Sequence, residues 1–220
     1  MKHGGIGMTS QRTRMRMVER LRGQGIRDEL VLATLGEVPR HLFVEEALAS
    51  RAYEDIALPL GFGQTISSPY TVARMTELAR AGGALERVLE IGTGCGYQAA
   101  ILSRLCRHVY TIERHKPLLK EAAARFAKLG FDNITAIAAD GSRGWPEPRT
   151  FDRIIVTAAA SEMPRPVVDQ LAEGGRMILP LGGILCDQRL VLLERGADGI
   201  DRRDLLPVRF VPLISRPPKP

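Results

Sequence analysis

Cysteines and long apolar runs are scarce in this chain of 220 residues. The three cysteines form no Cys-x-x-Cys pair and cannot all pair with one another, which argues against a disulfide scaffold. No apolar run approaches the roughly 20 residues that a membrane-spanning helix needs. The first residues also lack the apolar segment of a secretion signal. We therefore expect a cytoplasmic protein with reduced thiols, no membrane partner and no bound metal.

The excess of positive charge is small. Lysine and arginine number 31 against 25 acidic residues, which gives a net charge of +6. A basic chain can bind an anionic partner such as nucleic acid, but here the basic residues are scattered rather than gathered into a stripe. We therefore expect no nucleic-acid partner, and we expect a monomer. The length suffices for one domain with a sizeable core and a small addition.

The stretch 88–97 organises the rest of the chain. A short apolar run, 88–91, breaks into three alternating glycines, Gly92, Gly94 and Gly96, and an apolar helical pattern follows. This order predicts a strand, a tight glycine turn and a helix. Because glycine has no Cβ, such a turn lets a ligand lie against bare backbone. A turn without a ligand would gain nothing from three glycines in five residues, so we favour a binding site.

The spacing of the glycines indicates which ligand this is. A dinucleotide-binding turn reads Gly-x-Gly-x-x-Gly, but Tyr97 occupies the place of its last glycine. With Glu90 ahead of it, the pattern Glu-x-Gly-x-Gly-x-Gly resembles the S-adenosylmethionine site of class I methyltransferases. Glu113 ends the next apolar run about 20 residues later, where nucleotide-binding α/β folds place the acid that binds the ribose hydroxyls.

Strand and helix patterns alternate from residue 87 onward, which predicts an α/β, Rossmann-like, doubly wound and mostly parallel sheet with helices on both faces. The third strand ends at Asp140-Gly141, where an acid can accept from an adenine amino group or simply form a turn. We favour the ligand, because three successive strands end in candidate binding residues. The predicted strands cover 88–91, 109–112, 134–138, 151–157, 177–181, 189–194 and 208–213, and the predicted helices include 117–129 and 166–171.

Residues 1–80 form an N-terminal helical cap with a loop, within the same domain as the core at 81–220. Helices are predicted over 13–22, 28–35, 45–50 and 70–80. Residues 53–68 contain Pro and Gly and few helix signals, so we expect a loop there.

The end of that loop carries three hydroxyl side chains in four residues, Thr65, Ser67 and Ser68. They precede Pro69, which can open a helix. Ser67 or Ser68 therefore either caps this helix or takes part in catalysis, and the sequence pattern favours neither.

Several segments together resemble one family, the protein-L-isoaspartate O-methyltransferases, over about residues 25–213. The most specific is Gly63-Gln64-Thr65-Ile66-Ser67-Ser68-Pro69-Tyr70, which generic class I methyltransferases lack. The other segments are 38–44 (Val-Pro-Arg-His-Leu-Phe-Val), 88–97, 151–159, 179–182 (Leu-Pro-Leu-Gly) and 208–213 (Val-Arg-Phe-Val-Pro-Leu).

The resemblance implies a repair enzyme. Such enzymes transfer the methyl group of S-adenosylmethionine to the free α-carboxylate of L-isoaspartyl residues in damaged proteins and peptides. The methyl ester then closes spontaneously to a succinimide, which partly hydrolyses to normal aspartate. A carboxylate is already ionised at neutral pH, so this chemistry needs no general base.

The resemblance also implies roles for individual residues. Ser67 hydrogen-bonds the substrate carboxylate with Thr65 beside it, and Ile66 and Ser67 lie against the cofactor. Glu113 binds the ribose, Asp140 with Gly141 binds the adenine, and the backbone around Val211 pairs with the extended substrate peptide. The cofactor residues are thus expected to be Ile66, Ser67, Glu90, Gly92, Gly94, Gly96, Glu113, Asp140 and Gly141.

Two other functions compete with repair. The first is methylation of nucleic acid or a small molecule, which the positive charge favours. The loop 157–160 (Thr-Ala-Ala-Ala) lacks the Asn/Asp-Pro-Pro-aromatic block that would hold a flipped base, which argues against it. The second is a non-catalytic module that binds S-adenosylmethionine, against which the intact segment 65–67 argues.

Overall fold

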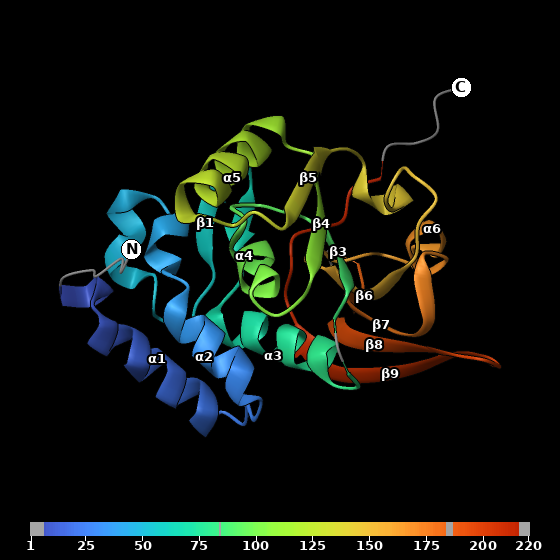
Figure 1. Cartoon of the computed structure of the whole chain (residues 1–220), viewed down its shortest axis with the longest axis horizontal. Helices are drawn as coiled ribbons and strands as arrows, with labels where there is room; N and C mark the ends of the chain where they lie inside the picture. The colour runs from blue at the N-terminus through green and yellow to red at the C-terminus, as the bar shows by residue number, and fades with distance from the viewer. Residues whose placement is uncertain (1–6, 84, 184–186, 216–220) are drawn as a thin grey trace.

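A seven-stranded sheet forms the centre of the protein in the computed structural model, which describes residues 7–83, 85–183 and 187–215 (Figure 1). The strand order is β5-β4-β3-β6-β7-β8-β9. Neighbours from β5 to β7 are parallel, and β8 and β9 add antiparallel to that edge. The strands are β3 (Arg87–Ile91), β4 (His108–Glu113), β5 (Ile134–Ala138), β6 (Phe151–Val156), β7 (Leu171–Leu181), β8 (Gln188–Gly196) and β9 (Gly199–Val208). The α/β, mostly parallel architecture is therefore confirmed.

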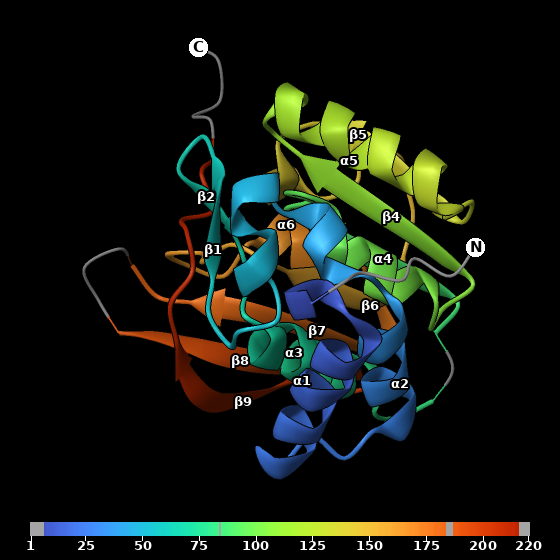
Figure 2. The same cartoon turned by 90° about the vertical axis from the view of Figure 1, so that its left-hand side faces the viewer.

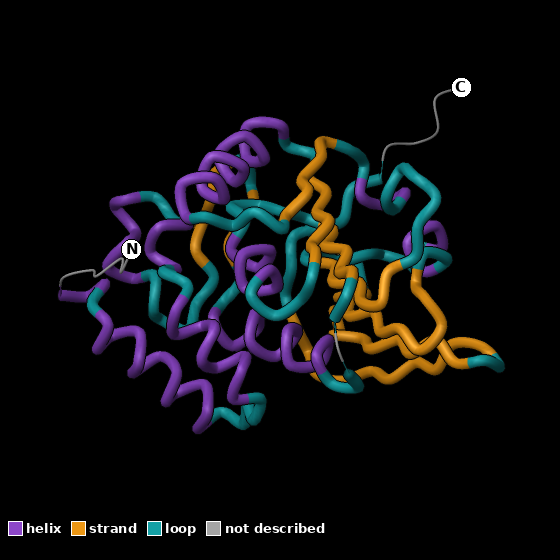
Figure 3. The backbone as a smooth tube through the Cα atoms, viewed as in Figure 1, coloured by secondary structure: helices purple, strands orange, loops and turns teal. Residues whose placement is uncertain are grey.

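Helices cover the two faces of the sheet unequally (Figures 1 and 3). One face carries α3, α4 and α5, whose apolar residues join Val88, Val109 and Ile178 in one core cluster. The other face carries Trp145 and the short α6 in a second cluster. The helices are α1 (Gln11–Gly23), α2 (Glu29–Glu37), α3 (Pro69–Arg80), α4 (Tyr97–Ser103), α5 (Lys116–Leu129) and α6 (Arg165–Val168).

Both faces of the central strands are buried, which explains their continuous apolar runs. Successive side chains of a strand point to opposite faces. Val88 therefore belongs to the core cluster under α3 and α4, whereas Leu89 belongs to the cluster under α6. The same alternation separates Ile178 from Leu179.

The N-terminal helices form a layer outside α3 and α4 (Figure 2). Asp28 caps α2, because its carboxylate accepts from the amides of Leu30 and Val31 at 3.0 and 3.2 Å. The segment after residue 45 is also helical, as a 3-10 helix over Glu46–Arg51. None of the helices in the described part of the chain combines the length and apolar character that crossing a bilayer requires.

The loop predicted over residues 53–68 is wrong in part, because it contains an antiparallel hairpin of β1 (Leu58–Gly61) and β2 (Gln64–Ile66). Its turn holds three successive residues with positive φ, at 82° for Gly61, 52° for Phe62 and 68° for Gly63. The strands span only four and three residues, so their alternation is too short to recognise in the sequence.

The helix predicted over residues 166–171 is also wrong in part. Only Arg165–Val168 is helical, and β7 begins at Leu171. Gly174 and Gly175 lie within this strand, where its pairing with β6 is irregular. The glycines therefore mark an irregular entry into a strand instead of the end of a helix.

The strand predicted over residues 208–213 is wrong, because the last strand is β9 and ends at Val208. Most of β9 is exposed and carries charged residues, so it lacks the apolar pattern of a core strand. The apolar segment 209–215 instead leaves the sheet and makes one isolated bridge, between Pro212 and Ala159. We call residues 209–215 the C-terminal strap.

Candidate active site

The glycine turn after β3 approaches its neighbours too closely for any side chain. Gly92 and Gly96 have φ values of 100° and 90°. A Cβ on Gly92 would lie 2.4 Å from the Thr157 hydroxyl oxygen, and one on Gly96 would lie 2.6 Å from the ring of Phe126. Both positions therefore require glycine for conformation and for space.

The amides of the turn are largely occupied within the protein. Gly92 and Thr93 donate to the carbonyl of Ile112 at 2.8 and 3.2 Å, and Gly96 donates to the carbonyl of Thr93 at 2.8 Å. A turn that binds a pyrophosphate instead points its amides at the ligand. Because few of its amides are free to bind a phosphate, this turn suits a nucleoside without phosphates.

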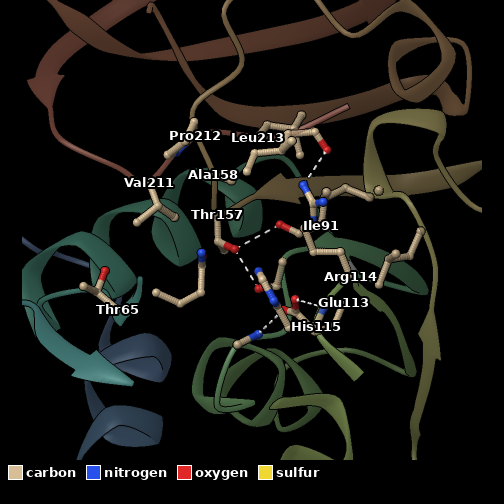
Figure 4. A pocket seen from close by; sticks show the side chains of 16 residues that line it. Thr65, Ile91, Glu113, Arg114, His115, Thr157, Ala158, Val211, Pro212 and Leu213 are labelled. Atoms are coloured by element: carbon tan, nitrogen blue, oxygen red, sulfur yellow. Dashed lines mark hydrogen bonds between the residues drawn. The ribbon is translucent and has the colours of Figure 1, made fainter. Parts of the chain in front are cut away.

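Glu113 lies directly beneath this turn (Figure 4). Its two carboxylate oxygens accept from the amides of Gly94 and His115, each at 2.8 Å. The side chain is only 5% exposed, yet it lines a pocket with Gly92 and Gly94. The two backbone donors fix a negative group at the pocket wall, where its remaining lone pairs can accept from ribose hydroxyls.

We call this cavity the glycine-turn pocket, and segments far apart in the sequence enclose it. The hairpin contributes Gln64 and Thr65, the sheet edge contributes Gly141 and Thr157, and the C-terminal strap closes one side (Figure 4). Its full lining is Gln64, Thr65, Ile91, Gly92, Gly94, Ile112, Glu113, Arg114, His115, Gly141, Thr157, Ala158, Val211, Pro212, Leu213 and Ile214.

Asp140 lines a neighbouring pocket with Arg114, Lys116 and Ile214. Its carboxylate accepts from the amide and the hydroxyl of Ser142, at 3.1 and 2.7 Å. Arg114 and Ile214 line both pockets, so the two adjoin. This brings Asp140 and Glu113 to the same edge of the sheet.

A third cavity, the Ser67 pocket, joins the hairpin to the other side of the glycine turn. It is lined by Leu60, Thr65, Ile66, Ser67, Val72, Glu90, Gly92, Thr93, Gly94, Cys95, Tyr97, Gln98 and Thr157. It shares Thr65, Gly92, Gly94 and Thr157 with the glycine-turn pocket. The predicted substrate residues and most of the predicted cofactor residues therefore face one continuous space, with Asp140 in the adjoining pocket. Gly96 lines none of these three pockets and faces Phe126 instead.

Ser67 and Ser68 differ in what their hydroxyls do. Ser68 caps α3, because its hydroxyl accepts from the amide of Thr71 at 3.3 Å. The Ser67 hydroxyl has no hydrogen-bond partner among residues 7–83, 85–183 and 187–215. Ser67 is thus the serine that remains available to a ligand.

Glu90 is completely buried on β3 at the inner end of the Ser67 pocket. Thr111 donates to one carboxylate oxygen at 2.5 Å, and the other oxygen has no partner in the described part of the chain. Burial raises the pKa of Glu90 to about 8. The unpartnered oxygen can accept from the amino group of S-adenosylmethionine, so the residues present fit this cofactor.

Val211 lies on the C-terminal strap and lines the glycine-turn pocket together with Thr65 (Figure 4). Its carbonyl accepts from the Ala159 amide at 2.8 Å, and the Leu213 amide donates to the Ala159 carbonyl at 2.7 Å. Arg114 donates to the Ile214 carbonyl at 3.1 Å and ties the strap to the end of β4. The strap is therefore extended and anchored on both sides of the pocket.

Thr157 is a site residue that the sequence reasoning missed. Its hydroxyl lies 2.9 and 2.7 Å from the carbonyl oxygens of Ile91 and Gly92. It thereby locks the start of the glycine turn and lines both adjoining pockets. The signal was present, because Thr157 is the last residue of the predicted strand 151–157, at the same edge of the sheet. No group of three metal-binding side chains occurs among the described residues.

Three features define an S-adenosylmethionine-dependent methyltransferase. These are the parallel sheet, the glycine turn whose amides are occupied within the protein, and the acids at successive strand ends. The profile of one family, described as protein-L-isoaspartate(D-aspartate) O-methyltransferase, matches residues 12–217. The chain therefore belongs to the protein-L-isoaspartate(D-aspartate) O-methyltransferase family. It is an enzyme, and its methyl donor is S-adenosylmethionine.

Individual relatives agree with this assignment. A protein-L-isoaspartate O-methyltransferase of Nitrosomonas eutropha is 55% identical over 97% of this chain and 96% of its own length. A solved protein-L-isoaspartate O-methyltransferase superposes with a TM-score of 0.82 at 30% identity, over 92% of this chain and 66% of that chain. A putative enzyme of this type from Plasmodium falciparum, in complex with S-adenosyl-L-homocysteine, gives a TM-score of 0.77 at 27% identity, over 91% and 98%.

The raised pKa of Glu90 predicts a pH-dependent stability. Between pH 4.5 and 8 the folded protein keeps a proton on Glu90 that the unfolded chain releases, so the free energy of unfolding falls as the pH rises. The slope is at most about 1.4 kcal/mol per pH unit. Replacing the side chain by Glu90→Gln removes this contribution. Urea unfolding at pH 6 and pH 8 measures it.

The expected advantage of the wild type over Glu90→Gln therefore shrinks from pH 6 to pH 8, by on the order of 2 kcal/mol. Glu173→Gln is the matched control, because Glu173 is exposed, and it is expected to keep the wild-type slope. An equal slope in Glu90→Gln and the wild type would show that Glu90 titrates normally.

Proposed function

We propose that this chain methylates the free α-carboxylate of L-isoaspartyl residues in damaged proteins and peptides, with Ser67 and Thr65 holding that carboxylate. The Ser67 hydroxyl carries the proposal, because it has no partner among the described residues and opens into the space around the glycine turn. A carboxylate placed there accepts from this hydroxyl while one of its oxygens faces the methyl group. Family membership and the relatives' names support this choice of substrate.

The chain's residues would promote methyl transfer by holding the two reactants in place and by excluding water. S-adenosylmethionine supplies a methyl carbon bonded to a positively charged sulfur. The substrate carboxylate has a reference pKa of about 3.3–4 and is ionised, so no side chain has to remove a proton. Ser67 and Thr65 hold the attacking oxygen, and the turn from Gly92 to Gly96 holds the donor. Such positioning can lower the barrier by roughly 7–11 kcal/mol.

The remaining site residues would bind the cofactor. We propose that Glu113 accepts from the ribose hydroxyls, that Asp140 and Gly141 contact the adenine, and that Glu90 receives the amino group. Ile66 would pack beside the cofactor, since it is buried and lines the Ser67 pocket next to Gly92 and Gly94. The shared edge of the sheet supports each assignment.

The C-terminal strap would receive the peptide. Val211 lines the same pocket as Thr65, so an extended chain alongside the strap would bring an isoaspartyl carboxylate to Ser67. Pairing through backbone groups suits substrates of varied sequence.

We further propose that the enzyme acts as a cytoplasmic monomer on proteins and not on nucleic acid. The loop after β6, residues 157–164, begins with Thr157 and three alanines and has no aromatic side chain to stack on a base. Cys95 and Cys106 are free thiols, which agrees with a reducing compartment. Burial raises the pKa of Cys95 to about 11, so this thiol is also unsuited to act as a nucleophile.

A matched pair of peptides tests the substrate. One peptide carries L-isoaspartate and the other carries L-aspartate at the same position, and each is incubated with methyl-labelled S-adenosylmethionine. We expect base-labile label on the isoaspartyl peptide alone, because only that peptide has a free α-carboxylate at the varied position. Bound cofactor with no label on either peptide would refute repair, and nucleic acid would then be tested as the acceptor.

Substitutions of the adjacent Ser67 and Ser68 distinguish a role in catalysis from a role in helix capping. Ser67→Ala is expected to lower kcat/KM for the isoaspartyl peptide by about 100-fold while the affinity for S-adenosylhomocysteine changes by less than about threefold. Ser68→Ala is the control, because it removes the cap of α3. It should cost about 1 kcal/mol of stability and leave kcat/KM of the folded protein within about threefold. Equal loss of turnover and cofactor affinity in Ser67→Ala would assign Ser67 to cofactor binding alone.

A further inference from the structure

Arg40 is a fully buried arginine whose two donor groups hold the backbone of the site. It lies in the 3-10 helix Arg40–Phe43 and is 0% exposed. Its Nε donates to the carbonyl of Ala52 and its Nη2 donates to the carbonyl of Ser67, each at 2.7 Å. A planar guanidinium thus joins the cap segment to the residue that carries the proposed catalytic hydroxyl.

No acid is in contact with the charge of Arg40 in the described part of the chain, although Asp55 acts on it from a greater distance. Arg40 forms no ion pair among the described residues, and its Nη1 atom has no hydrogen-bond partner there. Burial accordingly lowers the pKa of this side chain. An unpaired buried cation is costly, so packing alone is a poor reason for an arginine at this place.

The other contact of Arg40 reaches the cofactor side of the site. Its guanidinium carbon lies 4.9 Å from the ring centroid of Tyr97, the residue that follows Gly96. Tyr97 and Ser67 line the same pocket. Arg40 therefore spans from the substrate segment to the end of the glycine turn.

We propose that Arg40 is a positioning residue for methyl transfer, which fixes the Ser67 backbone at a set distance from the glycine turn. The inference rests on the function proposed above. The Ser67 hydroxyl has no partner of its own among the described residues, so its place depends on the backbone that carries it. Arg40 holds that backbone through the Ser67 carbonyl. A shift of about 1 Å can cost about 100-fold in rate.

Another buried arginine provides the control. Arg153 on β6 is 4% exposed and also donates to two backbone carbonyls, at 2.5 Å to Ala79 and at 2.7 Å to Asp152. It lines neither the glycine-turn pocket nor the Ser67 pocket. Replacing either arginine by methionine should lower stability, but only the Arg40 variant should alter catalysis.

The experiment compares Arg40→Met with Arg153→Met at a temperature where circular dichroism shows both folded. We expect Arg40→Met to lower kcat for the isoaspartyl peptide by about 100-fold, with S-adenosylhomocysteine affinity within about threefold of the wild type. Arg153→Met should keep kcat within about threefold. A kcat of Arg40→Met within threefold of the wild type, or an equal loss in Arg153→Met, would overturn the proposal.

Arg40→Lys tests the positioning role if the methionine variant does not fold. Lysine keeps the positive charge, but its single nitrogen cannot reproduce the planar fork, so we expect about a tenfold loss of kcat. Wild-type kcat in Arg40→Lys would contradict the need for two directed donors.

A double variant tests whether Arg40 acts through Ser67. If it does, Ser67→Ala combined with Arg40→Met or Arg40→Lys is expected to be no slower than Ser67→Ala alone, within about threefold. Losses that multiply would assign Arg40 a separate, structural effect. Wild-type activity is measured in the same assay. Its absence would refute the proposed function, whereas active wild type with unaffected Arg40 variants would refute only the positioning role.

Discussion

The hydrogen bond from the Gly94 amide to the Glu113 carboxylate joins the ends of two neighbouring strands, and the cofactor side of the site depends on it. The bond occupies an amide that a phosphate would otherwise bind, and it holds the Glu113 carboxylate at the wall of the glycine-turn pocket, where we propose that it accepts from ribose hydroxyls. Thr157 closes the turn from the next strand on the other side. Residues at the ends of three adjacent strands, β4, β3 and β6, therefore hold the glycine turn in place.

The acceptor side is built from different parts of the chain. The hairpin β1–β2, the segment after it and the C-terminal strap all lie outside the parallel core, yet they line the same continuous space as the glycine turn. In the function proposed above, the sheet edge would hold the methyl donor and the additions would hold the acceptor. This division explains how a fold common to many methyltransferases carries a site for one kind of carboxylate.

The sequence predicted the parallel strands and the edge at which they end well, because these depend on strands buried on both faces and on glycines that only a close approach requires. Glu113 and Asp140 followed from the rule that parallel strands end at one edge. The additions were harder to predict. The hairpin strands are too short to show alternation. The apolar segment 208–213 looks like a strand in the sequence, whereas the charged β9 does not. Arg40 was not predicted as a site residue, because a buried arginine contradicts the hydrophobic pattern on which core prediction relies.

The most direct test of the account is a crystal structure of the protein with S-adenosylhomocysteine and an L-isoaspartyl peptide. The account predicts that the free α-carboxylate lies within hydrogen-bond distance of the Ser67 hydroxyl, with one oxygen directed at the cofactor sulfur. It also predicts that Arg40 still donates to the Ser67 carbonyl. A carboxylate bound elsewhere, with Ser67 turned away from it, would contradict the central claim that the hairpin side of the site receives the acceptor.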